Sequence, residues 1–171
     1  LNYGSDKPDL RNPLLIKELT PVFENTEFNA FKGKTIRAIP VPDCDKQPRK
    51  FFDKMGEFAV KKGAKGLAWV KIDDNGEYSG SIAKFLSDND KKAINDICGM
   101  DKNYAVFFAA GQSDEAAKIA GLVRNELGVQ LDLLEKDVFR FCWIVDFPMY
   151  ELDEETGKIE FSHNPFSMPQ G

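Results

Sequence analysis

Hydrophobic residues recur at helical spacing in four segments of the chain. Residues 48–62, 87–99 and 113–128 each place an apolar face at three- and four-residue steps, which predicts three amphipathic helices. A shorter helix is predicted within residues 14–23 on the same grounds. The residues expected to face inward are Phe51, Phe52, Met55, Phe58 and Ala59 in the first helix, Ala93, Ile94 and Ile97 in the second, Ala116, Ile119, Ala120, Val123 and Leu127 in the third, and Leu14, Leu15, Leu19, Val22 and Phe23 in the short one.

Capping residues mark the ends of these helices. Ser87 with Asp90 three residues later forms a capping-box pattern, and Gly99 fits the C-terminal end of that helix. Ser113 is expected to cap the third helix. The first and third helices are predicted to stop at Gly63 and Gly128.

Strands are predicted between the helices, at about residues 34–41, 66–73, 78–85 and 104–110. The last is apolar throughout, as a central strand buried on both faces would be. Residues 138–151 and 158–163 predict a long C-terminal hairpin, with the acidic Asp153, Glu154 and Glu155 read as its turn rather than as a metal site. We therefore expect an α+β fold of two layers, with helices on one face of a mainly antiparallel sheet.

Composition narrows the class of protein. Hydrophobic residues make up 42% of the 171 residues and charged residues 30%, which fits a folded domain. Neither an apolar run near membrane-spanning length nor a secretory leader occurs, and three widely spaced cysteines fit a reducing cytoplasm. A net charge of −5 indicates that the chain does not hold a nucleic acid by itself, because proteins that wrap nucleic acid are usually basic. The start at Leu1 and the end at Gly171 look like cut edges of a longer chain.

Three strips at the ends of the chain carry a specific resemblance. Residues 3–11 read Tyr-Gly-Ser-Asp-Lys-Pro-Asp-Leu-Arg, residues 141–150 read Phe-Cys-Trp-Ile-Val-Asp-Phe-Pro-Met-Tyr, and residues 163–169 read His-Asn-Pro-Phe-Ser-Met-Pro. In this order they resemble the strips that leave and re-enter the catalytic domain of bacterial-type aspartyl-tRNA synthetases. The middle of the chain resembles the GAD domain, carried by residues 63–69, 82–86 and 107–111.

This resemblance implies three parts: a catalytic-domain flank at 1–21, a GAD insertion domain at 22–134, and returning catalytic strands at 135–171. For the parent enzyme it implies ATP-dependent aspartylation of tRNA through an aspartyl-adenylate, with magnesium, as a cytoplasmic homodimer. The class II signatures with their phosphate-gripping arginines are absent from this sequence; residues 139–142 do not match Phe-Arg-x-Glu, and no Glu-Arg pair occurs. The chain alone is thus expected to be inactive, with no catalytic residue, bound cofactor or metal of its own.

The resemblance also assigns candidate site residues. His163, the chain's one histidine, corresponds to a residue at the aspartate pocket, although from composition alone an exposed polar residue is the commoner reading. Asn164 replaces the second histidine of the commoner His-His-Pro-Phe version, which removes any role for a second imidazole. Pro165, Phe166, Ser5, Asp6 and Lys7 complete the candidate active-site strips, the last three being equally compatible with a solvated linker.

Lys50, Lys54 and Lys61 form a basic stripe on the first helix, a candidate RNA contact. Glu57 interrupts the stripe, and a solvated helix face is the commoner explanation of such a pattern. Two rival functions remain open at this point: a free-standing binding or scaffold domain, and a fragment of a tRNA-dependent amidotransferase B subunit, which shares the middle of the chain.

Overall fold

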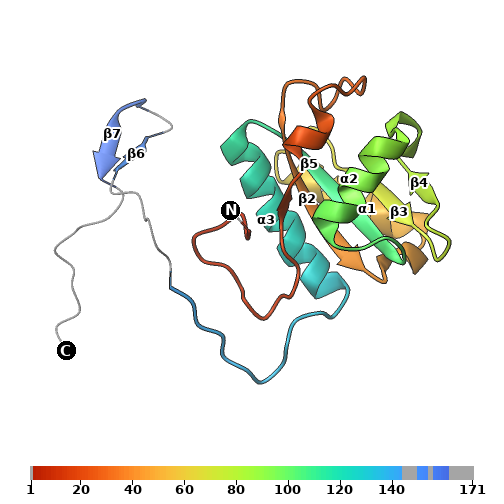
Figure 1. Ribbon diagram of the computed structural model, residues 1–171. Coiled ribbons are helices and arrows are strands. Elements are labelled where there is room, and N and C mark those ends of the chain that lie inside the picture. The colour runs from red at the N-terminus through yellow and green to blue at the C-terminus, as the bar shows by residue number, and fades with distance from the viewer. Residues whose placement is uncertain (1, 144–149, 154–155, 162–171) are drawn as a thin grey trace. The chain divides into compact units, whose positions relative to one another are not determined.

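The computed structural model describes residues 2–143, 150–153 and 156–161. The chain forms two compact units, Leu1–Arg140 and Phe141–Gly171 (Figure 1). The first unit holds a five-stranded sheet with three α-helices, and the second holds a two-stranded hairpin. Among the described residues there is no helix of the length and apolarity that a membrane span requires.

The sheet of the first unit is antiparallel throughout and has the strand order β1-β2-β5-β3-β4. The strands are β1 (Lys17–Glu18), β2 (Thr35–Pro42), β3 (Ala68–Ile72), β4 (Tyr78–Gly80) and β5 (Tyr104–Gly111). Strand β5 lies in the middle, pairing with β2 on one side and β3 on the other, so Phe108 is opposite both Ala38 and Ala68. The prediction of an α+β fold with a central, doubly buried strand is confirmed.

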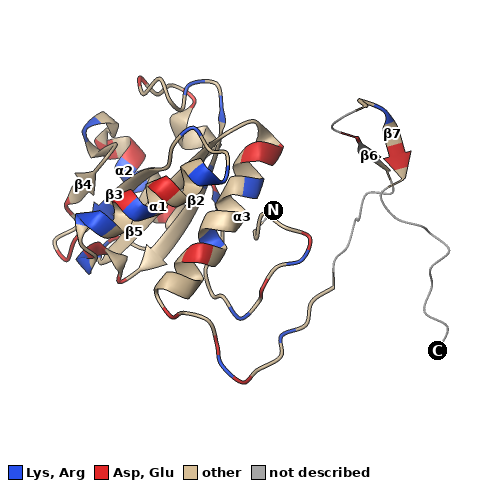
Figure 2. Cartoon of the chain, turned by 180° about the vertical axis from the view of Figure 1, so that it is seen from behind, with Lys and Arg blue, Asp and Glu red and all other residues tan. Residues whose placement is uncertain are grey.

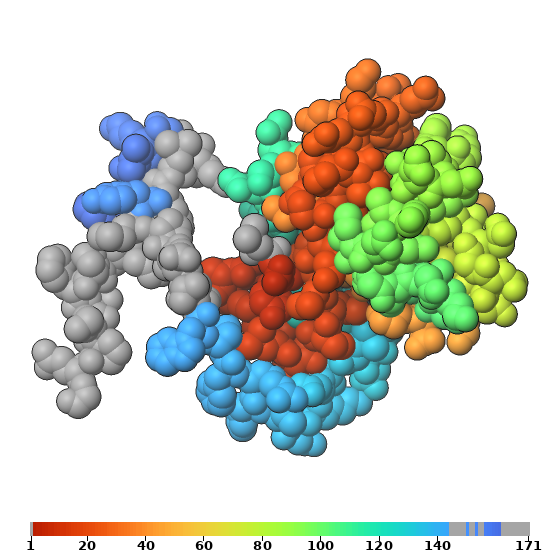
Figure 3. Space-filling view, viewed as in Figure 1, coloured from red at the N-terminus to blue at the C-terminus, as the bar shows by residue number. Residues whose placement is uncertain are grey.

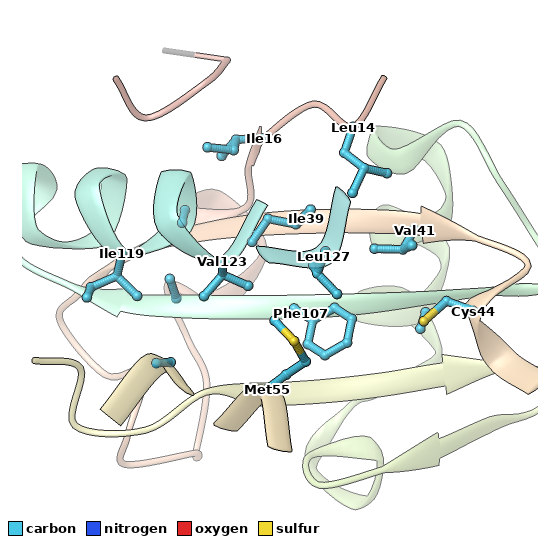
Figure 4. Close-up of a cluster of buried hydrophobic side chains, with 14 of the residues drawn as sticks. Leu14, Ile16, Ile39, Val41, Cys44, Met55, Phe107, Ile119, Val123 and Leu127 are labelled. Atoms are coloured by element: carbon cyan, nitrogen blue, oxygen red, sulfur yellow. The ribbon is translucent and has the colours of Figure 1, made fainter. Parts of the chain in front are cut away.

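Helices α1 (Arg49–Lys61) and α3 (Ser113–Gln130) lie side by side on one face of the sheet. Alternate residues of β5, including Phe107, point into this layer because successive side chains of a strand face opposite ways. Figure 4 shows the result: Met55 from α1 and Val123 from α3 meet Phe107 in one apolar cluster. The predicted inward face of α1 is confirmed, with Phe52 fully buried and Phe58 half-buried.

The opposite face of the sheet is buried as well, under a thinner layer that includes a helix, so helices lie on both faces rather than on one face as the sequence predicts. Helix α2 (Asp88–Cys98) covers it together with two short 3-10 turns, η1 (Thr20–Phe23) and η3 (Ala83–Phe85). Phe23, Phe31 and Phe108 pack there with edge-on or tilted rings, the geometry that aromatic quadrupoles favour. A third 3-10 turn, η2 (Cys44–Lys46), joins β2 to α1.

The structure confirms the capping box of α2 and corrects the ends of α3. Ser87 accepts from the amide of Asp90, whose carboxylate accepts from the Ser87 amide in return, and Gly99 ends the helix in the left-handed region. In α3, however, Gln112 holds the N-cap with Glu115 as its partner, so the predicted Ser113 cap is wrong. The predicted stop at Gly128 is also wrong, because α3 continues through it to Gln130.

The predicted helix at 14–23 is the clearest error. Leu14 and Ile16 are buried while Leu15 between them is exposed, which is the two-residue alternation of extended chain. Extended backbone continues into β1, and only the end of the segment turns, as η1. Two smaller corrections concern Ile97, which is 37% exposed, and the predicted strand 78–85, of which β4 is only the first part.

In the second unit, β6 (Tyr150–Leu152) and β7 (Ile159–Phe161) form the antiparallel core of the predicted hairpin. The amide of Gly157 donates to the carbonyl of Asp153 at 2.9 Å, and Gly157 takes a positive φ of 65°, which glycine adopts at little cost. Residues 138–143 carry no strand, so the hairpin is shorter than predicted on that side; residues 144–149 lie outside the described part.

Candidate functional site

The N-terminal strip, residues 3–14, lies directly against helix α3 (Figure 1). Gly4 meets Gly121 with nothing between the two backbones: a Cβ on Gly121 would stand 2.7 Å from the carbonyl oxygen of Gly4. A Cβ on Gly4 would overlap the carbonyl oxygen of Ala117, and its φ of +66° independently favours glycine. Both glycines are therefore required for this close approach.

Arg124 of α3 fixes the strip at its centre. Its side chain is fully buried, and its guanidinium donates to three main-chain carbonyls, those of Asp9 at 3.1 Å, Asn12 at 2.7 Å and Leu14 at 2.5 Å. The Tyr3 ring lies 5.0 Å from its Cζ, a cation–π distance. Burial lowers the pKa of Arg124, and Tyr3 and Asp9 oppose that shift.

Asn12 and Gly128 complete the contact. The Asn12 amide donates from Nδ2 to the carbonyl of Arg124 at 2.8 Å, and its Oδ1 accepts from the Leu14 amide at 3.0 Å. The same side chain occupies the space where a Cβ on Gly128 would stand, which explains why a glycine sits inside α3. The amide of Glu135 also donates to the carbonyl of Arg11 at 3.1 Å, so the segment after α3 joins the same surface (Figure 3).

Ser5, Asp6 and Lys7 form an exposed tip on this anchored strip. The Lys7 amide donates to Ser5 Oγ at 3.0 Å, and the Lys7 ammonium lies 3.3 Å from Asp6 in solvent. Behind the tip, Arg11 binds Asp9 at 2.7 Å, and this hydrogen-bonded pair holds the pKa of the Asp9 carboxyl below its usual value. The tip thus projects from a fixed base. The other predicted strip, His163, Asn164, Pro165 and Phe166, lies outside the described residues.

Lys50, Lys54 and Lys61 are exposed on α1 as predicted, but their surface is mixed in charge. Lys54 and Lys61 line a shallow groove between α1 and α3 together with Glu57 and Glu126. Figure 2 shows acidic and basic residues interleaved along this helix. Phosphate binding at this groove would therefore meet carboxylates as well as ammonium groups.

The sequence analysis did not predict the contact between Arg124 of α3 and the N-terminal strip, since a lone arginine on a helix is usually solvated. A signal was nevertheless present: Gly121, Arg124 and Gly128 are spaced three and four residues apart and so share one helix face. Two small residues around a large one on a single face indicate a place where another backbone comes close. The partner carbonyls, more than a hundred residues earlier in the chain, carry no such mark.

The comparison with known proteins agrees with this fold. The GAD domain family matches residues 27–120, which is more than half of the chain and includes β2 to β5 and α1. The chain belongs to the GAD domain family. The residues outside the match include the N-terminal strip, Arg124 together with the carbonyls that it binds, and the second unit.

Curated relatives extend the similarity of this GAD-domain chain to its full length. It is 58% identical over 171 residues to an aspartate–tRNA ligase of Streptomyces coelicolor, and 54% identical over 176 aligned positions to an aspartate–tRNA(Asp/Asn) ligase of Rickettsia bellii. All of the chain is covered in both cases, but it spans only 29% of the length of each relative.

Proposed function

We propose that this chain is the GAD insertion domain of an aspartate–tRNA ligase, residues 22–134, with flanks of the catalytic domain at 1–21 and 135–171. The observation that carries the proposal is the similarity of the whole chain, flanks included, to aspartate–tRNA ligases. A free-standing scaffold would have no use for the flanks, and an amidotransferase subunit should lack them. The parent protein would be a cytoplasmic homodimer charging tRNA-Asp, with or without tRNA-Asn.

In the parent, ATP with Mg²⁺ would activate aspartate as an acyl phosphate, and tRNA would then accept the aspartyl group. The described residues do not fit the metal part of this site: they contain no group of three or more His, Cys, Asp or Glu side chains placed to hold an ion. The phosphate-gripping arginine motifs are missing from the sequence too. Both would come from the rest of the parent, and the chain alone would make no aspartyl-adenylate.

For the substrate, we propose His163 as a hydrogen-bond donor to the side-chain carboxylate of L-aspartate, because an imidazole can carry the complementary charge. Asn164, Pro165 and Phe166 would shape the same strip. Ser5, Asp6 and Lys7 would approach the active site from the other flank, and the exposed position of these three residues on an anchored base is compatible with that role.

The insertion domain itself would act mainly as a rigid support. Arg124 ties the outgoing flank to α3 through three carbonyls, so the domain and the flank would move as one body. Contact of Lys50, Lys54 and Lys61 with tRNA remains the second part of the proposal, weakened by Glu57 and Glu126 in the same groove.

The test is the variant His163→Ala in the intact protein, with His163→Asn as the conservative control. Losing a charge-assisted hydrogen bond of about 1.5–3 kcal/mol should raise the KM for aspartate by roughly ten- to a hundredfold, while the KM for ATP changes little. The KM for aspartate of His163→Asn should lie between those of the unchanged protein and of His163→Ala, because an amide still hydrogen-bonds but carries no charge. Equal effects on both substrates would remove His163 from the aspartate pocket.

A further inference from the structure

A hollow of about 270 Å³ opens in the first unit, on the face of the sheet covered by α2. Its wall comes from four separate segments: the loop 28–34, residues 65–68 at the start of β3, residues 81–82 after β4, and residues 108–110 of β5. None of these residues belongs to the candidate strips or to the α1 stripe.

The wall of the hollow is aromatic and firmly held. Phe31 and Phe108 are 2% and 1% exposed, so they are fixed parts of the core. Phe28 is half-buried at the mouth, with its ring 4.9 Å from Phe31 and 4.8 Å from Phe85 between centroids. A side chain held from two sides loses little freedom when a flat ligand packs on it, because its rotamer is already set.

The charge at the rim is positive. Lys34 and Lys65 line the hollow, and the Lys34 ammonium is oriented by a 2.8 Å hydrogen bond to the carbonyl of Ala30. No acidic side chain is among its lining residues, in contrast to the α1 groove with Glu57 and Glu126. The charge of the side chains that line the hollow is therefore opposite in sign to the net charge of the chain, which is −5.

We infer that this hollow binds a single unstacked nucleotide of RNA, with the base against Phe28 and the phosphate at Lys34 and Lys65. Flat aromatic walls with flanking cations are the usual means of holding single-stranded nucleotides. The volume lies just under the usual ~300–1,000 Å³ of small-molecule sites, which fits one ring and excludes a longer stacked segment. With few polar groups in its wall, the hollow discriminates little between bases. The inference deepens the proposed function, from which it takes RNA as the ligand.

The test is an NMR titration of the ¹⁵N-labelled chain with adenosine 5′-monophosphate, uridine 5′-monophosphate and ribose 5-phosphate as probes. Both nucleotides should shift amide signals of residues 28–34 and 65–68, while ribose 5-phosphate, which has no base, should not at equal concentration. Phe28→Leu should weaken nucleotide binding about tenfold by removing the stacking ring, and Phe28→Trp should keep it. Because leucine preserves the apolar packing, unchanged spectra away from the hollow separate lost binding from lost folding.

Lysine variants provide the matched control. Lys65→Met should weaken binding several-fold, whereas Lys118→Met, the same charge change at an exposed lysine of α3, should leave it unchanged. Three outcomes would each overturn the inference. The amide shifts could be confined to α1, or Phe28→Leu could bind nucleotides as tightly as the unchanged chain. An acidic, leucine-containing peptide could also bind more tightly and displace the nucleotide. The titration does not depend on tRNA charging. If the intact protein charges tRNA but the hollow binds no nucleotide, the inference about the hollow is refuted and the proposed function is not.

Discussion

Arg124 and Asn12 bind each other reciprocally, each using its side chain to hold the other's backbone. Arg124 donates to the Asn12 carbonyl at 2.7 Å, and the Asn12 amide donates to the Arg124 carbonyl at 2.8 Å. The two residues are 112 positions apart and are 0% and 2% exposed. This pair connects the N-terminal strip to α3.

Replacing Arg124 with Met should destabilise the chain by roughly 3 kcal/mol, because two buried carbonyls and one part-buried carbonyl lose their donor. Each buried group left unpaired costs about 1–3 kcal/mol, and water can replace the donor at the part-buried one. Urea denaturation measures the loss, and amide exchange at Leu14 and Ile16 should accelerate. Arg49→Met is the matched control, since Arg49 is 85% exposed on α1 and should cost almost nothing. An equal effect of the two variants would mean that the Arg124 contacts contribute no net stability.

Gly121→Ala and Gly56→Ala should have opposite signs although both glycines lie inside helices. A Cβ on Gly56 meets nothing within 4 Å, so alanine should stabilise α1 by up to about 1 kcal/mol through its helix propensity. A Cβ on Gly121 would stand 2.7 Å from a backbone oxygen of Gly4, so the strip must shift, at a net cost of roughly 1–2 kcal/mol. Chemical denaturation of both variants measures the change in the free energy of unfolding. A stabilised Gly121→Ala variant would show that the strip can shift away from α3 at no cost.

Phe52→Ala should cost about 3–5 kcal/mol, since the ring is fully buried and stacks 4.3 Å from Trp69 and 5.3 Å from Phe107 between centroids. The sequence alone placed Phe58 on the same inward face. Because Phe58 is only half-buried, its alanine variant should lose clearly less in the same unfolding measurement. A loss below about 1 kcal/mol for Phe52→Ala would contradict the packing of α1 on the sheet.

The cysteines should differ sharply in reactivity. Burial raises the pKa of the Cys44 and Cys98 thiols to about 12, so at mildly alkaline pH both stay protonated and unreactive, whereas Cys142 is exposed. An aromatic disulfide reagent should therefore modify one thiol rapidly and the other two only after unfolding. The variant Cys142→Ser should abolish the fast phase. A fast phase that survives this change would show that a buried thiol is accessible.

The sequence predicted elements whose signals are local. The Ser87–Asp90 capping box and the apolar run of β5 are written within a few residues, and both appear as expected. It failed where distant residues decide. Leu14, Leu15 and Leu19 have helical spacing, but α3 and the sheet bury Leu14 and Ile16 on alternate positions of an extended chain.

The candidate site follows the same division. The exposure of Ser5, Asp6 and Lys7 matched their polar character, yet their anchoring depends on Arg124, whose partners lie at the other end of the chain. The hollow beside Phe28 was equally invisible, because its wall is assembled from four segments that meet only in the folded sheet. A pattern in sequence records the periodicity of an element, not which elements meet.

The central claim, that this chain is a dependent part of an aspartate–tRNA ligase, is tested most directly by aspartate-dependent exchange of pyrophosphate into ATP. The intact protein containing this chain and the 171-residue chain alone are assayed side by side. The account predicts exchange that requires aspartate in the intact protein and background levels with the chain. Exchange by the chain alone, or an intact protein indifferent to aspartate, would contradict it.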